Sequence, residues 1–192
     1  MSRPDPPFYV GATRPGAVGW TRIGMTAAMA LVLLVLGLTV RSAVPPLLVV
    51  LLAAVALGMA VWSWMRLWTR FIVDEHGVTV SYGGFWPQRP WDVAAFRTVQ
   101  LREIPGETLG VSVGPLGRPR GRIMTGAAHE RRPVAGRPVH PPELPQETYR
   151  MQVTRAGTMV EIIGRDGTHF LISPTDPEAT ALAVDQAIRA RR

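Results

Sequence analysis

The stretch GLTVRSAVPPLLVV, residues 37–50, places a single arginine, Arg41, between two long uncharged runs. The first run, residues 23–40, precedes Arg41 and the second, residues 43–65, follows it. Neither run contains a charged side chain. An α-helix rises 1.5 Å per residue, so about 20 apolar residues cross a hydrocarbon core of ~30 Å. Each run is therefore long enough to cross a membrane by itself.

The position of Arg41 decides between one membrane crossing and two. A single helix through both runs would be about twice the needed length and would hold Arg41 near the bilayer centre, at a cost of roughly 2.5–3.5 kcal/mol. Pro45 and Pro46 favour a turn instead, because proline suits the start of a helix and pushes the preceding residue out of helical geometry. The sequence predicts two transmembrane helices at about residues 21–40 and 43–66, within a membrane segment of residues 21–68.

Two other interpretations of the apolar residues 23–65 fit the sequence less well. An arginine-bearing N-terminus before an apolar run is typical of a signal peptide, but a second run follows at once, and cleavage after Ala43 would place Arg41 where a small residue is preferred. Helices buried in a soluble core are the other alternative, and neither run has the polar face that such helices carry.

Small residues recur at helical spacing within each run. Gly24 and Ala28 in the first, and Ala54 and Gly58 in the second, follow the small-xxx-small pattern that lets two membrane helices approach closely. The pattern is equally explained by the abundance of alanine, so both interpretations stand.

The distribution of arginine predicts the orientation. Only Arg41 lies in the expected turn, whereas Arg3, Arg14, Arg22, Arg66 and Arg70 lie outside the two runs. The positive-inside rule then places both termini in the cytoplasm of a multi-pass protein of the cell (plasma) membrane. Residues 1–20 are predicted to be an N-terminal tail. The side chains expected to anchor the protein at the membrane interface are Trp20, Arg22, Trp62, Trp64, Arg66, Trp68 and Arg70.

Composition narrows the class of protein further. The chain has no cysteine, which excludes disulfide frameworks and thiolate metal sites. All 21 basic residues are arginine, which suggests a GC-rich bacterial genome because lysine codons are AT-rich. The net charge is +7, but from residue 71 onward 15 arginines face 13 acidic residues, so no basic domain is evident and no nucleic-acid partner is expected.

Residues 69–192 follow the pattern of a small β-rich domain. Alternating apolar residues predict strands at 71–73, 78–82 and 93–104, and three more strands within residues 149–173. The sequence Arg-Asp-Gly at residues 165–167 is a strong hairpin signal, and Arg-Ala-Gly-Thr at residues 155–158 marks another turn. A closing helix is predicted to begin at Asp176, a residue suited to the N-cap position.

A proline- and arginine-rich insertion, at about residues 105–147, interrupts this pattern. It is predicted to be a long polar connection with one short strand near residues 109–113. Its arginines are candidates for contact with anionic lipid headgroups or a protein partner, and the alternative is a merely solvated insertion. These arginines are Arg118, Arg120, Arg122, Arg131, Arg132 and Arg137.

Two segments carry a resemblance to a known family. RFIVDEHGVTVSYGGFWPQRPWDVAAFRTVQL (residues 70–101) and VEIIGRDGTHFLISPTDPEATALAVDQAI (residues 160–188) resemble bacterial membrane proteins with a pleckstrin-homology-like (PH-like) domain after a two-span hairpin. The matching features are Pro90-Trp91 before a strand, Asp166 to Phe170, and Asp176-Pro177-Glu178. The chain is also similar to an actinobacterial family of two-span proteins with a small β-rich tail.

The PH-like resemblance implies a fold and a kind of function. It implies an α+β, mostly-β domain, a partly open β-barrel capped by one C-terminal helix, used for contact with proteins or the membrane rather than for chemistry. The long insertion departs from the family pattern and leaves strand pairing across it open.

No motif for chemistry stands out. The four histidines, at 76, 129, 140 and 169, lack metal-ligand spacing, and His169 in an alternating strand is expected to face the surface. Without lysine there is no phosphate loop of the Gly-Lys type, and no serine lies in a nucleophile elbow. We therefore expect a non-enzymatic protein without catalytic residues, metal or cofactor.

Two functions remain open at this point. One is a membrane-anchored adaptor whose domain contacts an unidentified protein or the membrane surface, with the bilayer as its permanent partner. The other is a subunit of a transport or secretion assembly, in which the hairpin itself makes the specific contacts.

Overall fold

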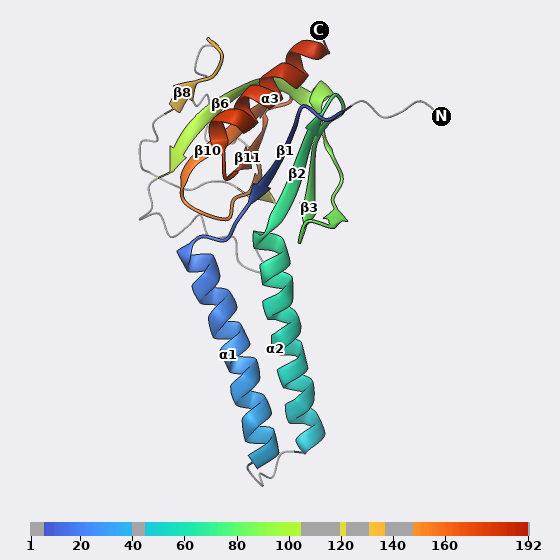
Figure 1. The fold of residues 1–192 in the computed structure, drawn as a ribbon, viewed down its shortest axis with the longest axis vertical. Helices are drawn as coiled ribbons and strands as arrows, with labels where there is room; N and C mark the ends of the chain where they lie inside the picture. Colours follow the sequence, from blue (N-terminus) through green and yellow to red (C-terminus); the bar gives the residue numbers. More distant parts are fainter. Residues whose placement is uncertain (1–5, 40–44, 105–119, 122–130, 137–147, 192) are drawn as a thin grey trace, which may run out of the picture.

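Two long helices extend side by side from one end of a β-rich body (Figure 1). The structure is a computed structural model, and it describes residues 6–39, 45–104, 120–121, 131–136 and 148–191. Helix α1 comprises Ala17–Thr39 and helix α2 comprises Pro46–Leu67. Both are long and apolar enough to cross a membrane. The turn at Arg41 lies outside the described residues.

Helix α2 begins where the two prolines lie. Pro45 is its N-cap residue and Pro46 occupies the first turn, three residues later than the sequence predicts. Proline at this position has its φ angle preset for a helix, and the first turn has no need of its missing N–H. The backbone N–H of Leu48 donates to the carbonyl of Pro45 at 2.9 Å and starts the helical ladder.

The helices pack through small residues and expose large ones. Ala30, Ala53 and Ala60 are buried, and Gly37 lies against Val49. Leucine, valine and methionine side chains cover the outside of the hairpin, among them Met25 at 69% and Leu47 at 80% exposure. Apolar surface of this extent is unfavourable in water and favourable in lipid.

Sheet A continues directly from α2. Its strands are β1 (Tyr9–Thr13), β2 (Thr69–Asp74), β3 (Gly77–Tyr82), β4 (Trp86–Pro87) and β5 (Trp91–Asp92), all paired antiparallel. The order is β1-β2-β3-β4, and β5 also pairs with β3. The predicted strands at residues 71–73 and 78–82 are confirmed as parts of β2 and β3.

Strand β1 is an element that the sequence did not predict. It lies within the segment taken to be an N-terminal tail, and it pairs with β2 from Tyr9 opposite Val73 to Thr13 opposite Thr69. Gly11 allows this pairing, because a Cβ atom at that position would collide with the ring of Phe71. The chain therefore enters the β-rich body before α1 and returns to the same sheet after α2.

Sheet B has the strand order β7-β9-β11-β10-β6-β8. Its strands are β6 (Phe96–Ile104), β7 (Arg120–Gly121), β8 (Arg131–Pro133), β9 (Thr148–Gln152), β10 (Gly157–Gly164) and β11 (Thr168–Ile172). The hairpin expected at residues 165–167 is confirmed, with Gly167 at a φ of 74°. The predicted strand at residues 93–104 begins with a 3₁₀ turn, Val93–Ala95, whose N-cap Asp92 accepts from the N–H of Ala94.

One strand pairing differs from what local turn signals indicate. The turn at residues 155–158 connects β9 to β10, but β9 pairs parallel with β11 instead of forming a hairpin with β10. A parallel pair is held by contacts distant in sequence, and a turn motif carries no information about it.

Helix α3 (Pro177–Ala190) closes the core between the sheets. Asp176 caps it as predicted, accepting from the N–H of Ala179 at 3.0 Å. Buried side chains of both sheets and α3 form one cluster, which includes Phe71, Val80, Val99, Phe96, Ile162, Phe170, Val184 and Ile188. The general α+β arrangement is as expected, with three helices and two sheets, and the strands that the structure describes do not close into a barrel.

Candidate functional site

The last turn of α2 joins the helical hairpin to the sheets. The final carbonyl groups of an α-helix have no donor within the helix and need one from elsewhere. Here three separate segments supply it. The N–H of Gly83 donates to the carbonyl of Met65 (2.8 Å), Nε2 of Gln152 to that of Arg66 (2.9 Å), and Oγ1 of Thr13 makes a longer contact with that of Leu67 (3.4 Å).

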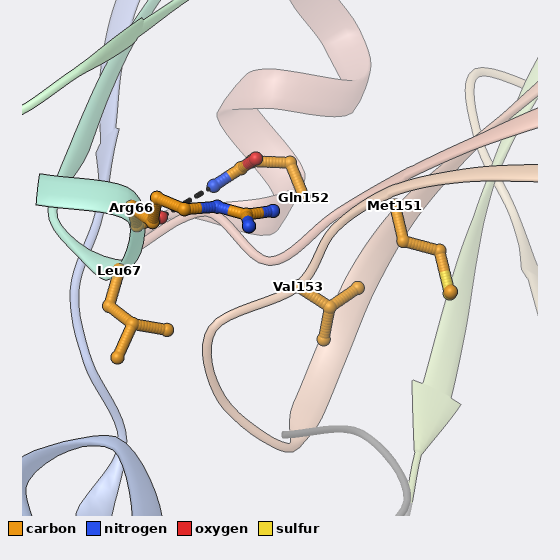
Figure 2. Close-up of a pocket in the computed structure, with 5 residues that line it drawn as sticks. All are labelled: Arg66, Leu67, Met151, Gln152 and Val153. Carbon is orange, nitrogen blue, oxygen red and sulfur yellow. Dashed lines mark hydrogen bonds between the residues drawn. The ribbon is translucent and has the colours of Figure 1, made fainter. Parts of the chain in front are cut away.

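Figure 2 shows the centre of this junction, where β9 meets α2. The side chain of Gln152 points at the end of the helix, and Arg66, Leu67, Met151 and Val153 complete the lining. The crevice between them has a volume of about 10 Å³, which is room for one water molecule at most. This is a close-packed joint and not a ligand pocket.

Helix α1 is tied to the same part of the body. The N–H of Gly16 donates to the carbonyl of Thr154 at 3.1 Å, and Oγ1 of Thr154 donates to the carbonyl of Arg14 at 2.8 Å. The N–H of Thr154 in turn donates to Oγ of Ser173. The residues that lead into α1 are thus anchored to Thr154, just after β9, and α2 is anchored to Gln152, the last residue of β9, which fixes the orientation of the sheets relative to the hairpin.

Aromatic rings surround the junction. The ring of Trp62 lies 6.4 Å from that of Tyr82 and 6.3 Å from that of Trp86, both edge to face. Trp64 and Trp68 also pack against each other, at 5.8 Å between centroids. Edge-to-face and tilted ring pairs each add a small attraction beyond the area they bury.

Arginines stack on this aromatic layer. The guanidinium of Arg14 lies over Trp68 and that of Arg66 over Tyr82, each 5.8 Å from the ring centroid. Such cation–π contacts keep the charge near the ring while leaving it accessible to polar groups. Tryptophan with arginine is the combination that membrane proteins place at the headgroup level.

The residues predicted to anchor the protein lie at one end of the hairpin. Trp20 and Arg22 belong to the first turns of α1, Trp62, Trp64 and Arg66 to the last turns of α2, and Trp68 and Arg70 follow directly. The structure brings them to the end that meets the sheets, and their role at a membrane interface stays a prediction.

The arginines of the insertion are not brought together by the described strands. Arg120 belongs to β7 at one edge of sheet B, whereas Arg131 and Arg132 belong to β8 at the other edge. Arg118, Arg122 and Arg137, and the strand expected near residues 109–113, lie outside the described residues. Contact of these arginines with lipid or a partner stays a prediction.

A broad groove lies beside β1 at the same end of the body. Its volume is about 630 Å³ and it is open to solvent. The lining combines an arginine with aromatic and small side chains: Tyr9, Val10, Gly11, Ala12, Trp68, Thr69, Arg70, Gly83, Gly84, Phe85 and Thr175. Sequence reasoning missed this groove because β1 forms one of its walls.

A second cluster of polar side chains is buried inside sheet B. Glu161 is fully buried, and its Oε1 accepts from Nδ1 of His169 at 2.9 Å and from Nη1 of Arg102 at 3.3 Å. Its Oε2 accepts from Nε2 of Gln100 at 2.7 Å. Since a carboxylate only accepts hydrogen bonds, Nδ1 of His169 carries the proton.

The prediction that His169 faces the surface is wrong, since its side chain is 5% exposed. Strand alternation does place it on the face opposite the core formed with α3, but that second face is buried too, around Met159, Leu171 and Val153. Alternation marks a solvent-facing side only where one face of a sheet is open.

The cluster holds Glu161 in its ionised form. Burial by itself raises the pKa of this carboxyl, but the hydrogen bond from His169, the charge of Arg102 and the hydrogen bond from Gln100 outweigh it and lower the pKa from 4.5 to about 2. Among the described residues no group of three metal-ligating side chains is present. A sealed, fully paired carboxylate stabilises the sheet and is closed to substrates.

Comparison with known proteins adds no family to this description. No protein-family model, no curated protein and no solved structure matches the chain. The function must therefore be argued from the junction, the groove and the exposed surface.

The Glu161 cluster predicts a specific loss of stability in acid. Because the folded-state pKa lies below the ordinary value, the contribution is complete above about pH 5 and is lost as pH falls towards 2. A shift of this size corresponds to about 3 kcal/mol. We expect Glu161→Gln to flatten the decline of unfolding free energy between pH 5 and pH 2, measured by denaturant unfolding in detergent.

Glu178→Gln is the matched control, since Glu178 is an exposed carboxyl in the first turn of α3. It should leave the acid dependence of the wild type nearly unchanged. An equal slope for Glu161→Gln and the wild type would contradict the assignment.

Proposed function

We propose that this chain is a non-enzymatic integral membrane protein that holds a PH-like domain against the cytoplasmic face of the plasma membrane, where the domain contacts the membrane surface or a protein partner. The observation that carries the proposal is the junction at the end of α2. Its carbonyls are capped by Gly83, Gln152 and Thr13, so the body holds one fixed face towards the end of the hairpin.

The composition of that face supports contact with a membrane surface. The groove beside β1 combines Arg70 with the aromatic side chains Trp68 and Phe85. Arginine binds phosphate groups and aromatic rings favour the boundary between headgroups and acyl chains. Anionic lipid headgroups are thus the partner that this surface suits best.

The order of elements supports a PH-like domain. A hairpin leaving the second span, the long strand β6, the hairpin β10–β11 and a closing helix capped by Asp176 follow the family pattern. Two features depart from it, the strand β1 contributed from before α1 and the parallel pairing of β9 with β11. The likeness of this body to a PH-like domain therefore rests on the order of its elements and on the closing helix.

Single cysteines test the topology, because the chain has no native cysteine and the background is zero. We expect a membrane-impermeant maleimide added to intact cells to label Ser42→Cys, between the two helices, and to leave His76→Cys unlabelled. His76 is in the β2–β3 turn with a 78% exposed side chain, so it should react fully once the cells are opened.

Labelling of His76→Cys in intact cells would contradict the cytoplasmic location of the domain. Labelling of neither position before lysis would contradict the two-span arrangement.

The alternative, a subunit of a transport or secretion assembly, is favoured by one observation. A Cβ atom added at Gly24 or Gly58 would meet no atom within 4 Å among the described residues, and Ala28 and Ala54 are exposed. The small-xxx-small faces are thus not used by the packing of α1 against α2. They are available to a helix of another subunit.

Gly58→Leu tests this alternative, with Met59→Leu as control, because Met59 is 42% exposed on the same helix but lies about 100° round its axis from Gly58. In native electrophoresis of gently solubilised membranes, an assembly held by the Gly58 face should fall to a smaller species in Gly58→Leu only. Identical migration of both variants and the wild type would leave the spans as an anchor alone.

A further inference from the structure

Two neighbouring aromatic side chains are exposed where β3 turns into β4, a segment of residues 83–86 that we call the β3–β4 turn and that ends with Trp86, the first residue of β4. Phe85 is 68% exposed and Trp86 is 55% exposed. Large apolar side chains at the tip of a turn are costly to hydrate, and an adjacent pair of them marks a contact surface more strongly than a single one does.

This turn is fixed in place against the end of α2. The N–H of Gly83 donates to the carbonyls of Met65 at 2.8 Å and Trp68 at 2.9 Å. Gly83 and Gly84 have φ angles of 61° and 83°, the left-handed conformation that a tight hairpin turn requires of both central residues. The position of Phe85 and Trp86 is thus set by the helix itself.

The ring of Trp86 reaches the level of the membrane-spanning part of α2. Its partner Trp62, 6.3 Å away, lies five residues before the last residue of α2, or about 7.5 Å along the helix axis. The Cα–Cβ bonds of a helix tilt towards its N-terminus, and the N-terminus of α2 is the end that lies away from the sheets. The ring of Trp62 therefore lies deeper than its own backbone, and Trp86 packs against it there.

We infer that the β3–β4 turn is a third membrane-inserted element, which places Phe85 and Trp86 at the boundary between headgroups and acyl chains beside the two spans. The occupant of this surface is the lipid bilayer, because the turn is continuous with the lipid-facing side of α2 through the contact between Trp86 and Trp62. Arg70 and the groove beside β1 then lie at headgroup level.

The inference rests on the proposed function in one respect, that the hairpin spans a bilayer. It goes beyond it because a rigid domain on a membrane anchor need not insert any part of itself. Insertion of the turn gives the β-rich body a lipid contact of its own, beside α2 and in addition to the two spans. This contact sets how far the sheets stand from the membrane.

Three single-cysteine variants of the full chain in proteoliposomes test the inference. Phe85→Cys reports on the turn, Leu31→Cys on lipid-facing α1, and His76→Cys on the far end of sheet A. Each carries an environment-sensitive fluorophore, and emission is compared with and without lipids that have a nitroxide near the top or near the middle of the acyl chain, because Leu31 lies close to the middle of α1. All three side chains are exposed, so the substitutions leave the core intact.

We expect a blue-shifted emission and loss of about half the intensity at Phe85, the response of a group roughly 5–10 Å below the headgroups, and no quenching at His76. Quenching at Leu31 with none at Phe85 would overturn the inference and leave the membrane anchor standing. Absence of quenching at both Leu31 and Phe85 would overturn the inference and the proposed function together.

Discussion

The carbonyl groups in the last turn of α2 need donors, and the β-rich body supplies them. The donors come from β1, from the turn after β3 and from β9, three segments that are far apart in the sequence. A helix end buried without such partners would cost several unpaired polar groups. Meeting this requirement collects strand ends of both sheets around one point, and the placement of the groove, the aromatic layer and the β3–β4 turn follows from it.

Local sequence signals predicted much of the fold. Charge-free runs and the Pro45-Pro46 pair predicted the two helices, Arg-Asp-Gly the β10–β11 hairpin, and Asp176 the start of α3. Strand β1 escaped detection because its five residues include Gly11 and its partner β2 lies beyond both helices. The parallel β9–β11 pair and the buried Glu161–His169 contact escaped for a related reason, since each depends on which segments the fold brings together.

The two polar features of the body differ in what they can do. Glu161 is enclosed and fully hydrogen-bonded within sheet B, so its charge contributes to the stability of the fold. Arg70, Trp68 and Phe85 are open to the surroundings at the end that meets the hairpin. The predicted anchors Trp20, Trp62 and Arg66 gather at that same end, the face through which we propose that the protein contacts the membrane.

Pulsed electron paramagnetic resonance on the doubly labelled protein in lipid nanodiscs tests the rigid junction most directly. With spin labels at Leu57→Cys on α2 and His76→Cys in the β2–β3 turn, the account predicts a single narrow distance distribution. Adding Gln152→Leu should broaden it by removing the donor to the carbonyl of Arg66, whereas Met151→Leu in the same crevice should not. A broad distribution in the otherwise unchanged protein would contradict the account.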